Sequence, residues 1–152
     1  MITVYCARPM TGFNMEELTE YYKNIRETLE PFGIRVFAPL SSAEKLLERE
    51  VQKASGYKHP LLTDHAIVAR DKWMIGECNI FLADWAPAVR PSLGMVVELT
   101  VANERRLHTI SVLPEGNVHQ HAFIIAQSDV IVYHLEDSLC YLVDLATKKS
   151  RI

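Results

Sequence analysis

One short segment of the chain combines a helix start, an uncovered stretch of helix surface and a carboxylate. Pro91 followed by Ser92 ahead of an apolar run predicts a helix with Ser92 as its N-cap. Gly94 lies one turn before Glu98, so both residues face the same side of that helix. A ligand can therefore rest against the backbone at Gly94 below the Glu98 carboxylate, and an anion can bind Ser92 and the first free amides.

The neighbours of Glu98 decide between a chemical role and a solvated surface carboxylate. They are apolar on both sides: Val96, Val97, Leu99 and Val101. A helix of this composition is largely buried, and a lone carboxylate on a buried helix is costly. We therefore interpret Glu98 as a catalytic residue, because carboxylates in such unfavourable surroundings are found mostly at functional sites.

A second carboxylate would extend this chemistry to glycosyl transfer. Retaining cleavage of a glycosidic bond uses two carboxyl groups about 5 Å apart, one as nucleophile and one as acid/base. Asp71 follows Arg70 on a predicted helix among apolar residues, and it is the better candidate than Asp84, which ends a strand. Taken alone, Asp71 is slightly better explained as a salt-bridged surface residue.

A loop after the first predicted strand is suited to enclose a polar ligand. It contains the small Ala7, the cationic Arg8 and the turn-forming Pro9 and Gly12. A loop of this composition with no ligand is equally compatible with the sequence.

The histidines and tryptophans give weaker indications of function than these carboxylates do. His119 and His121 form a close pair, but no third and fourth ligand accompanies them, so we expect no metal site. A polar or phosphate-contacting role suits His121 better. We expect Trp73 and Trp85 in the core or in a pocket wall.

Composition limits the class of protein. The 152 residues are 49% hydrophobic and 23% charged, which suits one globular domain over residues 1–152. A net charge of −3 argues against a nucleic-acid-binding surface. No run approaches the roughly 18 apolar residues of a membrane helix, and the first residues read as a strand rather than a signal peptide. Three widely spaced cysteines indicate reduced thiols and a cytoplasmic protein.

Alternating strand and helix patterns predict the fold. Strands are expected at 2–7, 34–38, 79–83, 109–113 and 130–134, and their continuous apolar character suits strands covered on both faces. Asn14 caps a first helix that ends before Gly33, and further helices are expected at 41–55, 63–78, 92–106, 119–127 and 138–148. The prediction is an α/β, doubly wound, Rossmann- or flavodoxin-like domain with a five-stranded parallel sheet and helices on both faces. The two longer loops, 7–13 and 84–91, follow strands, where ligands bind in such folds.

These residues resemble a known family. Pro91-Ser92-Leu93-Gly94, followed by Glu98-Leu99, is similar to the most specific motif of the nucleoside 2-deoxyribosyltransferase superfamily, closest to the 2′-deoxynucleoside 5′-monophosphate N-hydrolases. The similarity extends from residue 3 to residue 135. It implies that Glu98 attacks the anomeric carbon and that Ser92 binds the 5′-phosphate.

The resemblance also assigns residues elsewhere in the chain. Asp71 matches the family's second carboxylate, and Tyr22 matches an active-site tyrosine. His121 matches a residue that the neighbouring subunit contributes to the pocket, which implies a homodimer or a higher homo-oligomer. The family's first substrate loop corresponds to Ala7, Arg8, Pro9, Met10 and Gly12.

The chain differs from those hydrolases close to the expected pocket. Thr100 replaces a small residue, often glycine, two places after the catalytic Glu, and His121 replaces a serine. The loop at 84–90 is longer, and the first loop lacks a Gly-Gly end. These differences affect the choice of substrate more than the chemistry.

The expected activity is cleavage of the N-glycosidic bond of a (2′-deoxy)nucleoside 5′-monophosphate or nucleoside through a glycosyl-Glu98 intermediate. Ser92 favours a phosphorylated substrate and water as acceptor. The alternatives are transfer of the sugar to another base, hydrolysis of a CMP-like ribonucleotide, and nucleotide binding without turnover. None of these routes needs a metal or an organic cofactor, a nucleic acid or a membrane.

Overall fold

The short apolar runs form one parallel sheet. The computed structural model describes residues 1–39, 41 and 53–149, and five strands in it follow the order β2-β1-β3-β4-β5. The strands are β1 (Ile2–Ala7), β2 (Ile34–Phe37), β3 (Ile80–Asp84), β4 (His108–Val112) and β5 (Val130–Val132). This order is that of a doubly wound sheet of the flavodoxin type, so the predicted doubly wound, five-stranded parallel sheet is confirmed. The last strand is shorter than expected because its register with β4 ends at the pair Val112 and Val132.

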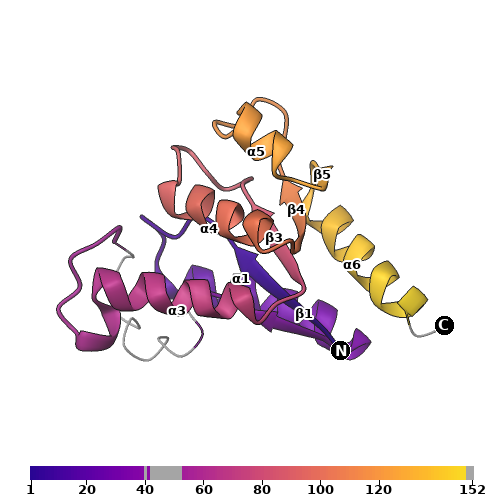
Figure 1. Ribbon diagram of the computed structural model, residues 1–152, viewed down its shortest axis with the longest axis horizontal. Coiled ribbons are helices and arrows are strands. Elements are labelled where there is room, and N and C mark those ends of the chain that lie inside the picture. Colours follow the sequence, from indigo (N-terminus) through magenta and orange to yellow (C-terminus); the bar gives the residue numbers. More distant parts are fainter. Residues whose placement is uncertain (40, 42–52, 150–152) are drawn as a thin grey trace.

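Helices connect the strands and cover both faces of the sheet (Figure 1). They are α1 (Met15–Leu29), η1 (Glu30–Phe32), η2 (Pro60–Leu62), α3 (Asp64–Gly76), α4 (Leu93–Glu104), α5 (Ala122–Ala126) and α6 (Leu135–Lys149). The helix expected at 41–55 falls mostly on residues 42–52, outside the described residues. Within the described part of the chain, no helix has the length and apolar character needed to cross a membrane.

Local signals account for most helix ends. The Asn14 side chain accepts from the backbone of Glu17 and the Glu17 carboxylate accepts from the backbone of Asn14, a complete capping box. Gly33, with φ 74°, takes the left-handed conformation that ends this helical stretch. The last helix begins at Leu135, before the expected residue 138, and Glu136 and Asp137 then lie in its first turn, where the helix dipole favours acidic residues.

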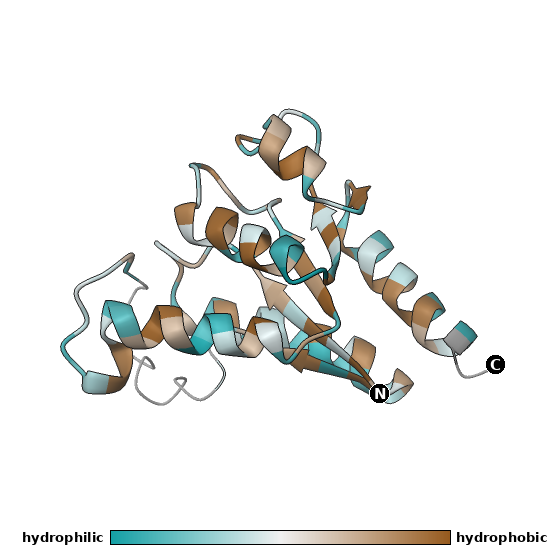
Figure 2. Cartoon of the chain, in the orientation of Figure 1, coloured by the Kyte–Doolittle hydropathy of each residue, from teal (hydrophilic) through white to brown (hydrophobic). Residues whose placement is uncertain are grey.

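Alternation along the strands sends neighbouring side chains to different cores. Val4 and Cys6 of β1 pack with α1 and α6 on one face. Tyr5 and Ala7 pack on the opposite face with residues of α3, α4 and α5. Figure 1 shows α3 and α4 next to each other in front of the sheet, and Figure 2 shows that hydrophobic residues dominate the strands between the two layers. The predicted helices on both faces are therefore confirmed.

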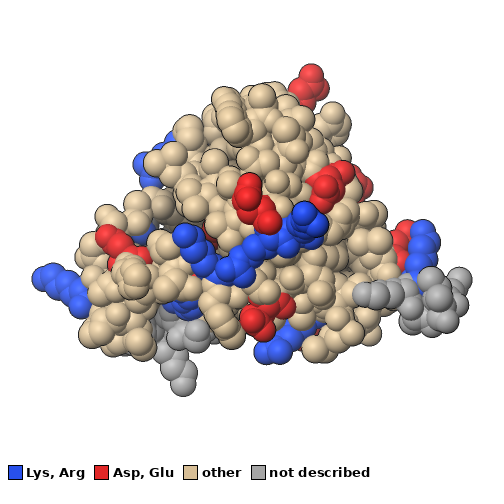
Figure 3. All heavy atoms as spheres, viewed as in Figure 1, with Lys and Arg blue, Asp and Glu red and all other residues tan. Residues whose placement is uncertain are grey.

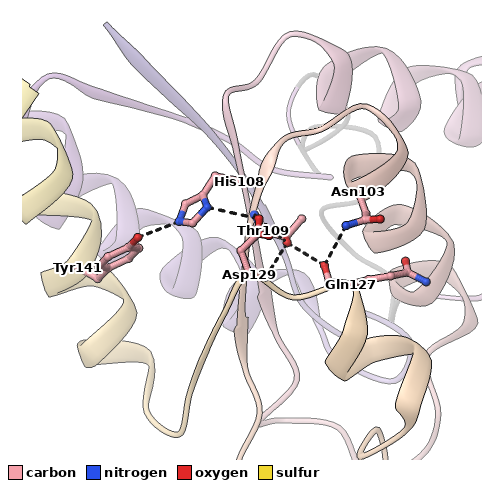
Figure 4. A network of polar contacts seen from close by, with 6 residues as sticks. All are labelled: Asn103, His108, Thr109, Gln127, Asp129 and Tyr141. Carbon is pink, nitrogen blue, oxygen red and sulfur yellow. Dashed lines mark hydrogen bonds and ion pairs between the residues drawn. The ribbon is translucent and has the colours of Figure 1, made fainter.

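A polar network holds the amino ends of the last two strands together (Figure 4). His108 lies 3.4 Å from the Asp129 carboxylate through Nδ1 and 2.9 Å from the Tyr141 hydroxyl through Nε2. Thr109 donates to Asp129 through its backbone N–H at 2.8 Å and to the Gln127 carbonyl through Oγ1 at 2.7 Å. Hydrogen bonds from Thr109 and the nearby His108 keep the pKa of Asp129 below its ordinary value. The network joins β4, β5 and α6 at the edge opposite the strand ends that carry the predicted site.

Strand order places the expected crevice. The chain winds from β1 to β2 on one side and from β3 to β4 on the other, so the loops after β1 and β3 diverge. In open α/β sheets this switch point, at the carboxyl ends of the strands, is where ligands bind. Both of the longer loops predicted from the sequence leave the sheet here.

Candidate active site

A cavity of about 560 Å³ opens at the carboxyl ends of β1 and β3, within the size range of small-molecule sites. Its walls come from the loop after β1 (8–13), the segment after β3 (87–95), residues 53–62 and the first half of α3. Glu98 and Asp71 both line it. A cavity therefore lies where the crevice was predicted, and both predicted carboxylates line it.

A hydrogen bond from the sheet fixes Glu98. The Tyr5 hydroxyl donates to Glu98 Oε1 at 3.1 Å. Tyr5 reaches α4 because it points to that face of β1, and its ring stacks on Phe81 of β3 with centroids 5.7 Å apart and planes 9° apart. Part of the Glu98 residue is exposed to solvent, but its carboxyl group is surrounded by protein atoms.

Burial dominates the electrostatics of the two carboxylates. Burial first and the negative charge of Asp71 second raise the pKa of Glu98 from 4.5 to about 8, against the lowering effects of the Tyr5 hydrogen bond and of Arg70. Burial also raises the pKa of Asp71 to about 6, although Arg70 Nε donates to Asp71 Oδ1 at 3.1 Å. The pKa of Glu98 lies above that of Asp71, so a proton favours Glu98 and must leave it before this carboxylate can act as a nucleophile.

The start of α4 is fixed by a brace from the loop after β4. The Ser92 backbone N–H donates to His119 Nε2 at 2.8 Å. His119 Nδ1 lies 3.1 Å from Asn117 Oδ1, and since Nε2 accepts, Nδ1 carries the hydrogen and donates. The His119 ring packs on Trp85 at 4.5 Å, and Asn117 Nδ2 donates to the Trp85 carbonyl at 2.9 Å. Burial lowers the pKa of His119, which favours this neutral form.

The same turn faces the cavity with unused polar groups. Ser92 occupies the predicted N-cap position, but its hydroxyl makes no capping hydrogen bond. Ser92 and Gly94 line the cavity, and a Cβ built on Gly94 would meet no atom within 4 Å. Packing therefore does not require glycine at this position. Its effect is to leave the helix backbone open one turn from Glu98.

The residues predicted in the first loop divide into two groups. Arg8, Pro9 and Met10 line the cavity. Ala7 is buried at the end of β1 in the core under α3 and α4, and Gly12 shapes the turn with φ 94° without lining the cavity.

Tyr22 and Asp84 lie on the α1 side of the sheet. Tyr22 is buried in that core, does not line the cavity, and its hydroxyl has no hydrogen-bond partner. The charge of Glu98 nevertheless contributes to raising the pKa of Tyr22, after the effect of burial and of Cys6, so the two groups interact at longer range. Asp84 accepts from the Tyr21 hydroxyl at 2.8 Å and from the Ala86 N–H at 3.1 Å. It does not join the Glu98 pair.

His121 lies outside the cavity of its own chain. It caps α5 by accepting from the Phe123 N–H at 3.3 Å, and it is exposed. Trp85 is buried as expected, whereas Trp73 is 61% exposed and is neither a core residue nor a cavity wall. Across the described residues, no group of three or more His, Cys, Asp or Glu side chains is arranged to hold a metal ion.

Two contributors were missed from the sequence: Tyr5 and His119. Tyr5 carries a hydroxyl in an otherwise apolar strand, and that mismatch is a usable signal, since a buried tyrosine hydroxyl usually has a polar partner. His119 was considered only as a metal ligand. No local pattern connects it to Ser92, 27 residues away.

Comparisons with known proteins identify a family for most of the chain. The family described as "Nucleoside 2-deoxyribosyltransferase" matches residues 4–123. No curated protein matches the sequence.

Solved structures share the fold. A 2-deoxyribosyltransferase from Bacillus psychrosaccharolyticus has a TM-score of 0.63 at 18% identity, covering 90% of each chain. The CMP N-glycosidase BcmB of Clostridium botulinum has a TM-score of 0.58 at 21% identity, covering 94% of this chain and 98% of that one. A conserved protein of Enterococcus faecalis V583 has a TM-score of 0.60 at 16% identity, covering 100% and 99%.

The raised pKa of Glu98 predicts a cost to stability at high pH. Because the pKa rises from 4.5 to about 8 on folding, the native protein loses stability as pH increases through that interval. Glu98→Gln carries no charge, so we expect it to be more stable than the wild type by about 4 kcal/mol at pH 8, with the difference vanishing below pH 4.5. Thermal or urea unfolding from pH 4 to pH 9 measures this. Glu104→Gln, at the exposed end of the same helix, is the control. A pH-independent difference would contradict the burial account.

Proposed function

The chain belongs to the nucleoside 2-deoxyribosyltransferase family, and we propose that it breaks the N-glycosidic bond of a (2′-deoxy)nucleoside 5′-monophosphate or nucleoside through Glu98. The observation that carries the proposal is the setting of this carboxylate. Glu98 accepts from Tyr5 and interacts with Asp71, and it lies one helical turn from the open backbone at Gly94. A surface carboxylate would have none of these features.

The arrangement supports a two-step reaction. A Glu98 oxygen attacks C1′ of the sugar as the C1′–N bond breaks, and the bond's electron pair leaves with the base. The proton on Glu98 must leave before attack: Asp71 accepts it and passes it to the departing base. Water then attacks C1′ of the glycosyl ester and gives its proton to the ionised Asp71, which frees the sugar and restores the Glu98 carboxylate.

The start of α4 supports a phosphorylated substrate. A 5′-phosphate placed there would accept from the free Ser92 hydroxyl and from the amides of Leu93 and Gly94, at the positive end of the helix dipole. The His119 brace fixes the turn before the ligand arrives, so little ordering is required on binding. We favour water as the acceptor, because the hydrolases that the chain resembles bind the 5′-phosphate through the corresponding serine.

A homo-oligomer that shares its pockets completes the proposal. Three apolar residues on α3 and α4 are exposed: Trp73, Leu93 and Val97. Such a group of apolar side chains is unusual on a surface that only water covers. Figure 3 shows this face largely uncharged, with a band of basic side chains flanked by acidic ones. Packing against a second copy would cover these residues. His121, which does not line the cavity of its own chain, would then be available to the partner's cavity.

Base release tests the catalytic proposal. We expect the wild type to release free base from members of a panel of deoxy and ribo nucleosides, with and without a 5′-phosphate, measured by chromatography. Glu98→Gln should lower kcat by at least about 10³-fold, because it removes the nucleophile. Glu104→Gln should leave the rate unchanged.

The panel also separates the alternatives. Exchange of the base when a second base is added identifies a transferase, and a strong ribo preference would overturn the deoxy assignment. Binding of nucleotides without any release by the wild type would contradict catalysis altogether.

Light scattering tests the oligomer. We expect the wild type to be a dimer or larger at micromolar concentration, and Trp73→Glu together with Val97→Glu to produce monomers, because two charges cannot be buried in an apolar interface at low cost. Phe32→Glu, at an exposed apolar residue of η1, is the control and should leave the mass unchanged. A monomeric wild type would contradict the shared pocket.

A further inference from the structure

Arg8 is a buried cation whose Nε has no hydrogen-bond partner. Only 9% of it is exposed. Within the described part of the chain, its guanidinium forms no ion pair. Leaving a buried charge unpaired is costly. Burying this cation therefore costs free energy that hydrogen bonds within the protein do not offset.

Two aromatic rings hold the guanidinium. Its central carbon lies 4.6 Å from the centre of the Phe13 ring and 4.3 Å from the centre of the Tyr21 ring. Contacts with ring faces stabilise the cation and restrict its plane, while its N–H groups at the edge stay able to donate. Asp84 interacts with Arg8 at longer range but is engaged by the Tyr21 hydroxyl. Arg8 is thus a fixed donor that lines the same cavity as Glu98.

The position of Arg8 in the cavity places it beside the base of a bound nucleotide, an assignment that rests on the proposed function. Glu98 and the Ser92–Gly94 turn are both on α4, so the sugar and the phosphate occupy that side of the cavity. Arg8 lies across the sheet edge, beside Tyr21 of α1. The base is the remaining part of a nucleotide. The nearby wall, which includes Met10, Phe13 and Tyr57, offers it apolar and aromatic surface.

We propose that Arg8 donates hydrogen bonds to a carbonyl oxygen of the departing base and makes the enzyme selective for pyrimidines. A pyrimidine has such an oxygen next to its glycosidic nitrogen, and a purine does not. When Glu98 forms its bond to C1′ and the C1′–N bond breaks, the electron pair enters the ring and increases the negative charge on that oxygen. Arg8 stabilises this charge until the base is protonated, as preorganised donors do at other developing anions.

The test compares substrates as well as variants. In the wild type, kcat/KM should favour pyrimidine over purine 5′-monophosphates by at least about 10-fold. Arg8→Gln should lower kcat/KM for pyrimidine nucleotides about 10²-fold and for purine nucleotides only about 3-fold or less. The pyrimidine loss should shrink for a 5-fluoropyrimidine, whose base is a better leaving group. Arg8→Lys, which keeps the charge but not the planar edge, should recover part of the loss.

Arg90→Gln, at the other arginine that lines the cavity beside the start of α4, is the matched comparison. Its effect should be equal for purines and pyrimidines. Circular dichroism checks that each variant folds, and the wild-type preference stands as a test even if an Arg8 variant does not fold.

Three results would overturn the inference while leaving the proposed function intact: no pyrimidine preference in the wild type, an equal loss for all bases in Arg8→Gln, or a loss confined to phosphorylated substrates. The last would identify Arg8 as a phosphate ligand. Absence of base release from every substrate would instead contradict the proposed function itself.

Discussion

The hydrogen bond from Tyr5 to Glu98 is the contact on which the site depends. It ties the first strand to the helix that carries the carboxylate, across the core under α3 and α4. Tyr5 reaches Glu98 because the alternation of β1 directs residue 5 to that face, and the stack on Phe81 leaves the ring little freedom. A shift of one residue in β1 would send the hydroxyl to the opposite core. The register of the sheet and the position of the carboxylate are therefore set together.

The two sides of the sheet edge contribute different chemistry to one cavity. On the α4 side, burial raises the pKa of both Glu98 and Asp71, and the braced Ser92 turn presents donors. On the α1 side, Arg8 lies against two rings, and its Nε has no hydrogen-bond partner. Both sides retain polar groups whose burial is unfavourable in the free protein. That cost is expected where a ligand supplies the missing partners.

Sequence patterns predicted what local physics determines. The five strands, the Asn14 cap, the turn at Gly33 and the helix that begins after Ser92 all depend on neighbouring residues, and each was placed to within a few positions. Glu98 and Asp71 were selected because a carboxylate on an apolar helix is unusual, and the structure brings both to one cavity. Tyr5 and His119 were missed because their contacts join residues 93 and 27 positions apart. The exposure of Trp73 was likewise hidden, since sequence cannot separate an apolar residue in the core from one on the surface.

The central claim is that Glu98 becomes covalently attached to the sugar. A nucleotide with fluorine at C2′ in the arabino configuration slows hydrolysis of a glycosyl ester, so mass spectrometry of the protein mixed with it tests the claim directly. We expect a mass increase equal to the sugar phosphate, located by digestion on the peptide that contains Glu98 and absent from Glu98→Gln. Release of the base with no adduct, and with inverted configuration at the anomeric carbon, would contradict it.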